Sequence, residues 1–465
     1  MSNLTKLLFQ SASGNSSGLT LENFGYQVNV DSTNTTTMNF GFSSMKMKGN
    51  NVYLSINQKD NGVKGCFFLS FNHSEGTINS SFSKKIPYTA WEANYSEVGY
   101  WGNDHVYMPV FSRGNGDNSF TEMAGGVLDE DGTLQPLYLG YTSAGHMCAS
   151  YSEGCYVIAQ EQGAPNGFKY SVFKINSSGV TQWKKVCGFV SSNSPQSAFI
   201  SGDGVFVDEN DDLYIAGTAR DYSATGSQYI GVILKLSSNG TSQIIDNTPY
   251  ADSTAVYKPR GAFKYGSNFY ALYNQSQGKK TVIRNFGSSL SNAGTSYDLT
   301  NTSIDAIWRT NIASNGYVWL QARSTVSNSI ECWCIDLNSL TTGTSNIVVG
   351  YRVTLSESIK NYCGLAADDS GNAVLSFCPD QFKNPDQIYV ISLLIDGSSA
   401  GTLTGGSQNI TVTDVTTTGN PTLNAFSSSN VTASNLSSLT ISDHSYSVAT
   451  TDRWQSYSPS LTNIT

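Results

Sequence analysis

The sequence predicts an all-β protein built from repeated four-stranded units, and this fold class rests on composition, a recurring apolar run and the turns around it. Aromatic residues make up 12% of the chain, glycine occurs 43 times, and Ser, Thr and Asn crowd the segments between apolar runs. Residues of these kinds favour strands and turns. Segments with helical periodicity and capping residues are hard to find, so we expect an all-β chain.

A short apolar run recurs along the chain at intervals of roughly fifty residues. In a common register, the runs have as anchor residues Tyr53, Tyr107, Val157, Tyr214, Tyr270, Val318 and Val374. Each run is followed by a variable loop, a second apolar run such as "GCFFLSF" or "GVILKL", a turn and a more polar run. With the strand before each anchor, four strands form one repeat, which is typical of a β-propeller with long blades. We predict seven four-stranded blades, with the anchors on second strands and the following apolar runs as third strands.

Three segments are expected along the chain. Residues 1–35 form an N-terminal docking or ring-closing segment, residues 36–405 the propeller, and residues 406–465 a small Ser/Thr-rich β appendage. In the appendage, apolar residues such as Ile410 and Val412 alternate with Thr, as in strands with one wet face. We expect it to add strands to an open edge of the propeller, of a partner subunit or of a symmetry mate. The alternative is a disordered polar tail.

The stretch "VDENDDLYIAG", residues 207–217, is acidic enough to suggest a calcium loop, a catalytic carboxylate pair or a hairpin turn. A calcium loop of the EF-hand type needs Gly at its sixth position, where this chain has Leu213, and a following helix, where it has a strand-like run. Asn and Asp are favoured in turns because they hydrogen-bond their own backbone. We therefore predict turns at Asp208–Asp212 and Asp129–Asp131 with carboxylates that face solvent and bind no metal.

Charge and motifs argue against several classes of function. Lys and Arg number 26 against 35 Asp and Glu, and no basic stripe occurs, which disfavours nucleic-acid binding. The four histidines are isolated, and zinc, nucleophile-elbow and phosphate-loop motifs are absent. No apolar stretch is long enough for a signal-peptide core or a membrane span. We predict no catalytic residues, no metal ligands and no cofactor, although two carboxylates from different blades could still form a glycosidase pair.

The eight cysteines allow two cross-strand pairs. Cys363 and Cys378 would lie opposite each other across a Ser370-Gly371 turn, and Cys148 and Cys155 flank the turn at "SEG". Because no leader directs the chain to an oxidising compartment, buried reduced thiols are the expected state. The sequence leaves open whether either pair ever oxidises.

A recognition surface is expected on the side of the ring that carries the long loops. The turns between first and second strands and between third and fourth strands share one face and are short, whereas the other loops are long and irregular. Aromatic residues that could stack on sugar rings or anchor a protein contact are Trp91, Tyr222, Tyr250, Tyr257 and Phe382. The alternative is that each of them packs over its own blade.

The opening "MSNLTKLLFQSASG", the hairpins "NVYLS" and "DDSGNAVLSF", and the alternating Thr/Ser-rich C-terminus together resemble virion-associated proteins of tailed bacteriophages, especially marine ones. The resemblance implies a non-enzymatic structural protein, tail-associated or for host attachment, that is oligomeric in the particle. Its partners would be other virion proteins and, as an additional ligand, a host surface glycan. It would be made in the host cytoplasm without a signal peptide and located in the virion. The alternatives are a bacterial surface or filament interaction module and a glycan-cleaving propeller enzyme.

Overall fold

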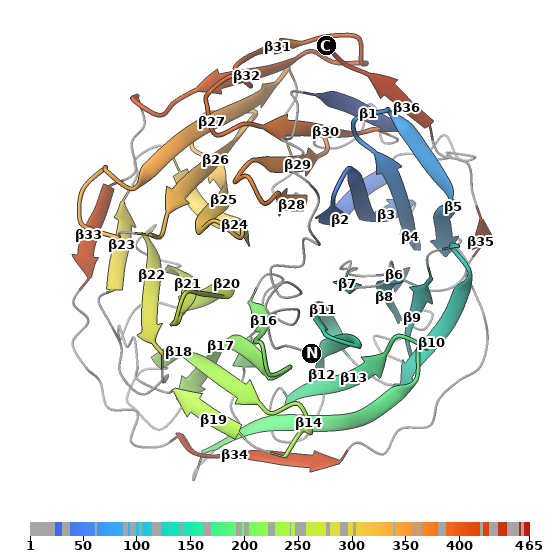
Figure 1. Cartoon of the computed structure of the whole chain (residues 1–465), viewed down its shortest axis with the longest axis vertical. Coiled ribbons are helices and arrows are strands. Elements are labelled where there is room, and N and C mark those ends of the chain that lie inside the picture. Colours follow the sequence, from blue (N-terminus) through green and yellow to red (C-terminus); the bar gives the residue numbers. More distant parts are fainter. Residues whose placement is uncertain are drawn as a thin grey trace, which may run out of the picture.

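Strands are the only regular elements in the described part of the chain, and they are arranged around a central axis as in a β-propeller (Figure 1). The computed structural model describes residues 24–29, 38–60, 63–86, 92–93, 99–101, 105–113, 122–129, 131–140, 143–161, 169–191, 198–199, 204–221, 228–241, 243–246, 257–275, 280–288, 296–300, 304–338, 340–356, 359, 364–379, 387–418, 422–426, 436–443, 455–456 and 460–465.

The first half of the ring is formed by three sheets. The ten-stranded sheet contains β2 (Met38–Lys48), β3 (Asn51–Asp60), β4 (Val63–Asn72), β5 (Thr77–Ile86), β6 (Glu92–Ala93), β7 (Gly99–Trp101), β8 (His105–Arg113), β9 (Glu122–Leu128) and β10 (Leu134–Gly140), with a tenth strand from the C-terminal region. The next sheet contains β11 (Ser143–Tyr151), β12 (Gly154–Glu161), β13 (Lys169–Asn176) and β14 (Thr181–Ser191). The third contains β15 (Ala198–Phe199), β16 (Val205–Val207), β17 (Leu213–Asp221), β18 (Gln228–Leu236) and β19 (Gln243–Asp246).

Three further sheets complete the ring. They contain β20 (Tyr257–Tyr265), β21 (Asn268–Gln275), β22 (Lys280–Gly287) and β23 (Ser296–Thr300); β24 (Ile304–Ile312), β25 (Tyr317–Ser324), β26 (Ser329–Asp336) and β27 (Ile347–Leu355); and β28 (Gly364–Ala367), β29 (Ala373–Phe377) and β30 (Gln387–Leu393). Neighbouring strands within each sheet are antiparallel, except that β4 and β6 pair in parallel. In Figure 1, the first strands β11, β20, β24 and β28 lie on the axis side of the strands that follow them.

Interior strands are apolar on both faces because each sheet is packed between two others. Val318 and Leu320 of β25 lie in the core on one side of their sheet, and Trp319 lies in the core on the other side. All three side chains are buried. This explains why the runs that identified the repeats are nearly continuous and apolar rather than strictly alternating.

The predicted strand roles are confirmed, but the predicted count of seven separate blades is corrected. All seven anchors lie on second strands, which are β3, β8, β12, β17, β21, β25 and β29. The strands that the structure describes nevertheless form six hydrogen-bonded sheets, because β6 pairs with both β4 and β8 and so joins two four-stranded meanders into one sheet. A bridging strand of two residues leaves no periodic signal in the sequence.

The ring is closed by an N-terminal strand. The strand β1 (Gly25–Asn29) pairs antiparallel with β30, so that Tyr26 lies opposite Val390 and Val28 opposite Ile388. It thereby supplies the fourth strand of the β28–β30 sheet, whose first three strands come from near the other end of the propeller. Val28 is fully buried, so closure also adds to the core.

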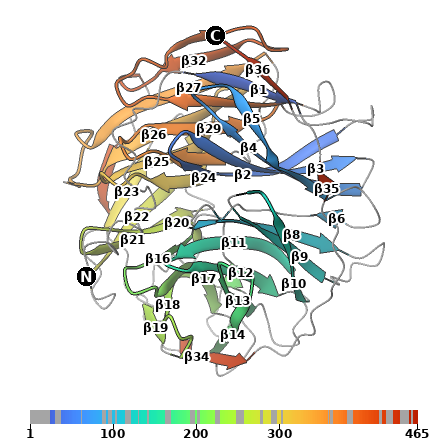
Figure 2. The ribbon, with the colours of Figure 1, turned by 45° about the vertical axis from the view of Figure 1, so that its right-hand side comes forward.

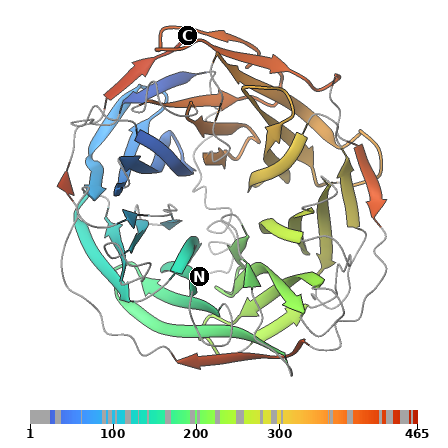
Figure 3. The same ribbon diagram turned by 180° about the vertical axis from the view of Figure 1, so that it is seen from behind.

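The C-terminal strands lie on the outer rim of the ring. After β31 (Gly401–Leu403) come β32 (Ile410–Asp414), β33 (Thr422–Phe426), β34 (Leu436–Asp443), β35 (Gln455–Ser456) and β36 (Ser460–Asn463). They pair in turn with β27, β23, β14, β5 and β1. Figures 1 and 3 show them around the periphery, and Figure 2 shows β32 and β34 at opposite ends of the molecule. We call β32–β36 with Ile464 and Thr465 the C-terminal belt. The expected addition of strands to the propeller's own edges is confirmed.

Candidate functional site

The structure describes only part of the predicted recognition surface. Tyr257 is the first residue of β20, where its backbone lies opposite Gln275. Trp91, Tyr222, Tyr250 and Phe382 lie outside the described residues. Recognition through these five residues therefore stays a prediction, and the described site is on the short-turn side.

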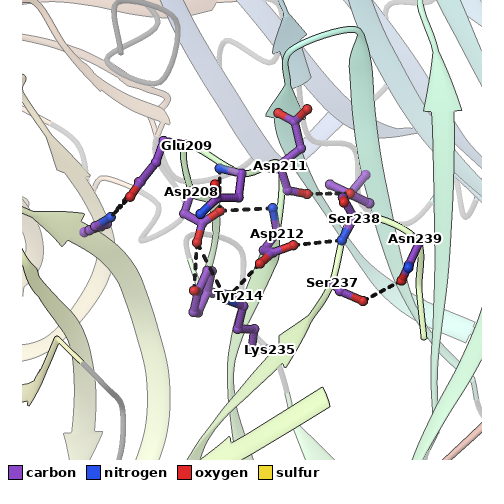
Figure 4. A network of polar contacts seen from close by, with 12 residues as sticks. Asp208, Glu209, Asp211, Asp212, Tyr214, Lys235, Ser237, Ser238 and Asn239 are labelled. Atoms are coloured by element: carbon purple, nitrogen blue, oxygen red, sulfur yellow. Dashed lines mark hydrogen bonds and ion pairs between the residues drawn. The ribbon is translucent and has the colours of Figure 1, made fainter. Parts of the chain in front are cut away.

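The acidic stretch is a turn that joins β16 to β17 (Figure 4). The backbone N–H of Asp208 donates to the carbonyl of Asp212 at 3.0 Å, and the N–H of Asp211 donates to the carbonyl of Asp208 at 3.0 Å. Asp211 has a φ of 62°, the left-handed conformation that Asp tolerates better than most residues. The hairpin-turn interpretation is confirmed.

The prediction that these carboxylates face solvent is wrong for Asp208, whose exposed fraction is 3%. Its Oδ1 accepts hydrogen bonds from the N–H groups of Asn210 and Asp212 at 2.9 and 3.1 Å. Its Oδ2 accepts one from the hydroxyl of Tyr214 at 2.8 Å and lies 3.8 Å from Lys235 Nζ. A carboxylate can be buried because donors replace the water that it loses. In the other predicted acidic turn, Asp129 is half-buried and accepts local N–H groups in the same way.

The turn is tied to the preceding sheet through Asp211. Its carboxylate accepts hydrogen bonds from the N–H and the hydroxyl of Ser152, at 3.0 and 2.6 Å. Its backbone carbonyl accepts one from the Tyr156 hydroxyl at 2.7 Å. Ser152 lies in the turn between β11 and β12, and Tyr156 lies on β12. These contacts fix the β16–β19 sheet to the β11–β14 sheet.

The turn is tied to the following sheet through Glu209. Lys264 of β20 donates to both carboxylate oxygens of Glu209, at 2.6 and 2.5 Å. The hydrogen bond from Lys264 is the main reason why the pKa of Glu209 lies below its ordinary value. Both side chains are partly exposed, so this contact is a surface ion pair.

A second turn of the same sheet, Ser237–Gly240, carries further contacts. The Ser238 carbonyl accepts hydrogen bonds from Lys174 Nζ at 2.8 Å and from Trp183 Nε1 at 3.1 Å. The Ser238 N–H donates to Asp212 Oδ1 at 2.8 Å, and Asp212 pairs with Lys235 at 2.8 Å. Figure 4 shows Asp212 between Lys235 and Ser238. The two turns and the preceding sheet therefore form one continuous network.

The titration properties of this network suit structural donors better than catalytic groups. Burial raises the pKa of Tyr156 and of Tyr214, with smaller contributions from the acidic residues around them. Burial also lowers the pKa of Lys174, whose ammonium lies 4.5 Å from the centre of the Tyr151 ring. Tyrosines with raised pKa values keep their hydroxyl protons and can donate them to the carbonyl and carboxylate acceptors. A general base would instead need a pKa near the working pH.

The same contact recurs between other sheets, and we call it the inter-sheet latch: a ring side chain on one sheet donates to a carbonyl in the first turn of the next sheet. Trp319 Nε1 donates to the Gly371 carbonyl at 2.7 Å. The Tyr265 hydroxyl lies 3.3 Å from the Asn315 carbonyl and shares its proton with Asn338 Oδ1. Sequence analysis missed Ser152, Tyr156 and Lys264; the available signal was their separation of 55 to 59 residues from the acidic turn, close to one repeat.

Within the residues that the structure describes, no three His, Cys, Asp or Glu side chains are grouped so that they could hold a metal ion. That same part of the chain has no helix with the length and apolar character needed to cross a membrane. Cys148 lies opposite Val157 and Cys155 opposite Ser150, so the two cysteines are offset in register. Burial raises the pKa of the Cys155 thiol well above its ordinary value. Cys363 lies outside the described residues, so its expected position opposite Cys378 stays a prediction.

No protein-family profile and no curated protein sequence matches this chain. Among solved structures, it is similar to the phage phi92 endosialidase, with a TM-score of 0.41, 11% identity and coverage of 80% of this chain and 69% of that one. For the Dos1 propeller the TM-score is 0.41, the identity 11% and the coverage 78% and 95%. For prolyl oligopeptidase B from Galerina marginata they are 0.43, 11%, 72% and 47%. The likeness concerns the propeller fold alone.

Proposed function

We propose that this protein is a non-enzymatic component of a tailed-phage virion, tail-associated or for host attachment, that binds other virion proteins and a host glycan. The main observation behind this proposal is that three features hold the ring closed: β1, the inter-sheet latches and the C-terminal belt. A ring that opens rarely is slow to unfold, which suits a protein that must persist in a particle outside the cell. The sequence resemblance to virion-associated proteins supports the same assignment.

The difference between the short-turn face and the long-loop face of the ring supports binding on the long-loop side. On the short-turn side, the described polar groups of the acidic turn are engaged within the protein, as for Asp208 and Glu209. Long loops on a rigid scaffold are where binding residues gather, and this chain places aromatic residues in them. Trp91, Tyr222 and Tyr250 are the proposed anchors for a sugar ring or a protein partner.

The buried acids favour binding over glycan cleavage. Glu331 has an exposed fraction of 0% and accepts hydrogen bonds from Ser324 at 3.1 Å and from Trp333 at 3.0 Å. Arg352 donates to it through Nε at 3.0 Å and Nη2 at 2.9 Å. A glycosidase acid must reach the oxygen of its substrate. Glu331, like Asp208, is instead engaged inside the protein.

Mass identification of purified particles, with antibody labelling in the electron microscope, tests the location. We expect this chain in particles after stringent purification, with label on the tail. Its presence in a bacterial surface fraction and absence from particles would favour the surface interaction module instead.

A binding assay tests the recognition face. The triple variant Trp91→Ala, Tyr222→Ala and Tyr250→Ala should lose binding to host cells or to isolated surface glycan, with an unchanged unfolding midpoint. The control is Val180→Ser, which changes a side chain of 55% exposure in the short turn before β14. Release of reducing sugar by the wild-type protein would contradict a purely binding role.

A further inference from the structure

The outer strand of a propeller sheet has one unpaired edge, and such edges pair readily with other chains. Here the belt occupies the outer edge of β27, β23, β14, β5 and β1. All five pairings are antiparallel, with Val353 opposite Val412 in the first and Val28 opposite Leu461 in the last. The belt visits the sheets in the reverse of chain order from β27 to β5 and then reaches β1, so it runs around the whole ring (Figure 1).

Within the described residues, two outer strands have no belt partner, and both carry features that disfavour strand addition. The strand β10 contains Pro136, which has no N–H to donate to a neighbour. The described part of strand β19 is four residues long. Prolines and short lengths are common protections of sheet edges. The five outer strands that the belt covers contain no proline and have at least five residues each.

The last residues of the belt attach it to β1 and to the segment after β31. Ile464 has an exposed fraction of 1%, and its N–H donates to the Gly25 carbonyl at 3.0 Å. Thr465 and Thr404 exchange two backbone hydrogen bonds, at 2.9 and 2.8 Å, so the end of the belt meets the segment that precedes its first strand. Gly25 is required here, because a Cβ at this position would lie 2.7 Å from Ile464 Cγ1. We call Ser460–Thr465 the clasp.

We propose that the belt caps strand edges that otherwise bind the belt of a second copy of this chain, and that the clasp controls the exchange. The occupant follows from the sequence of the belt: these edges bind its strands in defined register, and a second copy carries the identical strands. Exchange of an identical element between copies forms oligomers without any new kind of contact. The surface is thus an interface between copies that the clasp keeps closed.

The test uses the full-length protein with Ile464→Asp, which places a charge in the buried clasp position. We expect oligomers that increase with protein concentration in light scattering, whereas the wild-type protein keeps one state. Amide hydrogen exchange in β1 should accelerate by at least about tenfold as its outer partner leaves. Val180→Asp, which puts the same charge at an exposed position, is the matched control and should behave like the wild type.

A synthetic peptide of residues 455–465 distinguishes edge exchange from general misfolding. Added in excess, it should occupy the vacated edge and reduce the oligomers of the Ile464→Asp protein. The proposal is overturned by a variant with wild-type oligomeric state and exchange, or by oligomers that the peptide does not reduce. If Ile464→Asp is insoluble, Gly25→Ala, which crowds the same clasp from β1, replaces it with the same expectations.

Discussion

The turns Asp208–Asp212 and Asp368–Asn372 have the same backbone but different means of holding the neighbouring sheet. In both, the first N–H donates to the fifth carbonyl, at 3.0 and 2.9 Å, and the first carboxylate accepts the fifth N–H, at 3.1 and 2.8 Å. In both, the fourth carbonyl accepts a latch from the preceding sheet at 2.7 Å. The fourth residue is Asp211 in one turn and Gly371 in the other.

The neighbouring sheet explains this difference. A Cβ on Gly371 would lie 2.5 Å from Tyr317 Cδ2, so only glycine fits there. Tyr317 is the first residue of β25, two before the latch residue Trp319; the equivalent residue before Tyr156 is Gly154. With no ring at that position, the chain accommodates a side chain at Asp211, which binds Ser152. Local sequence determines the turn, and the adjacent repeat determines which residues the turn accepts.

The largest expected loss of stability follows removal of the buried carboxylate of Asp208, and removal of the half-buried carboxylate of Asp368 should cost less. Asp208→Ala leaves two N–H groups and the Tyr214 hydroxyl without their acceptor, which should lower the free energy of unfolding by about 3 kcal/mol. Asp368→Ala should cost about 1 kcal/mol, because Asp368 is half-buried. Denaturant titration of both variants measures the difference, and equal losses would contradict the comparison.

The next prediction tests whether Tyr317 crowds Gly371, the fourth residue of the Asp368–Asn372 turn. Gly371→Ala should destabilise the protein by about 2 kcal/mol, through left-handed strain and contact with Tyr317. The matched control is Gly266→Ala, at a φ of 58° with no atom within 4 Å of the added Cβ. It isolates the strain and should cost about 1 kcal/mol. If Gly266→Ala lowered the free energy of unfolding as much as Gly371→Ala, crowding by Tyr317 would not explain the loss at Gly371.

A smaller effect is expected when Asp211 is changed to the residue of the other turn. Asp211→Gly relieves the left-handed strain but removes the hydrogen bonds to Ser152, which are exposed. The two contributions oppose each other, so the free energy of unfolding should change by less than about 1 kcal/mol. Thermal unfolding of this variant beside Ser152→Ala checks the balance; a loss as large as that of Asp208→Ala would mean that the side-chain contact dominates.

The smallest expected effect concerns Glu209, whose carboxylate forms the ion pair with Lys264 of the following sheet. Glu209→Gln should cost less than about 0.5 kcal/mol at neutral pH, because the pair with Lys264 is partly exposed. The pKa of Glu209 is lowered in the folded protein, so the unfolded chain takes up the proton first as pH falls. The contribution is therefore complete above the unfolded pKa and lost as pH falls through the folded one. Urea titration against pH and salt should show the variant and the wild type converging in acid and in high salt.

The repeat pattern predicted which runs become second and third strands because interior strands of a propeller are buried on both faces and must be apolar. The bridge by β6 was not predictable, since it depends on spatial proximity of β4 and β8 and involves only two residues. The same holds for the burial of Asp208: composition marks a turn, but the donor from Tyr214 and the charge of Lys235 reach the carboxylate only in the folded sheet.

Alternation in the appendage predicted strands, and Ile410 and Val412 are buried as the pattern requires. The path of those strands could not be read from the sequence, because any open edge of suitable length offers the same backbone groups. The inter-sheet latches could in principle have been predicted from the sequence. Their partners are one repeat apart, and a search for donors one repeat before each Asp or Gly turn would have found Tyr156 and Trp319.

The belt also imposes an order in time on the making of this protein. The clasp pairs Asn29 with Ser460, 431 residues away in the chain, so an early strand gains its outer partner only from residues that are synthesised much later. Contacts between such distant residues form slowly, because the intervening chain must be organised first. The sheets that the belt joins are all earlier in the chain, so a ribosome releases the sealing segment only after every surface that it covers has been made.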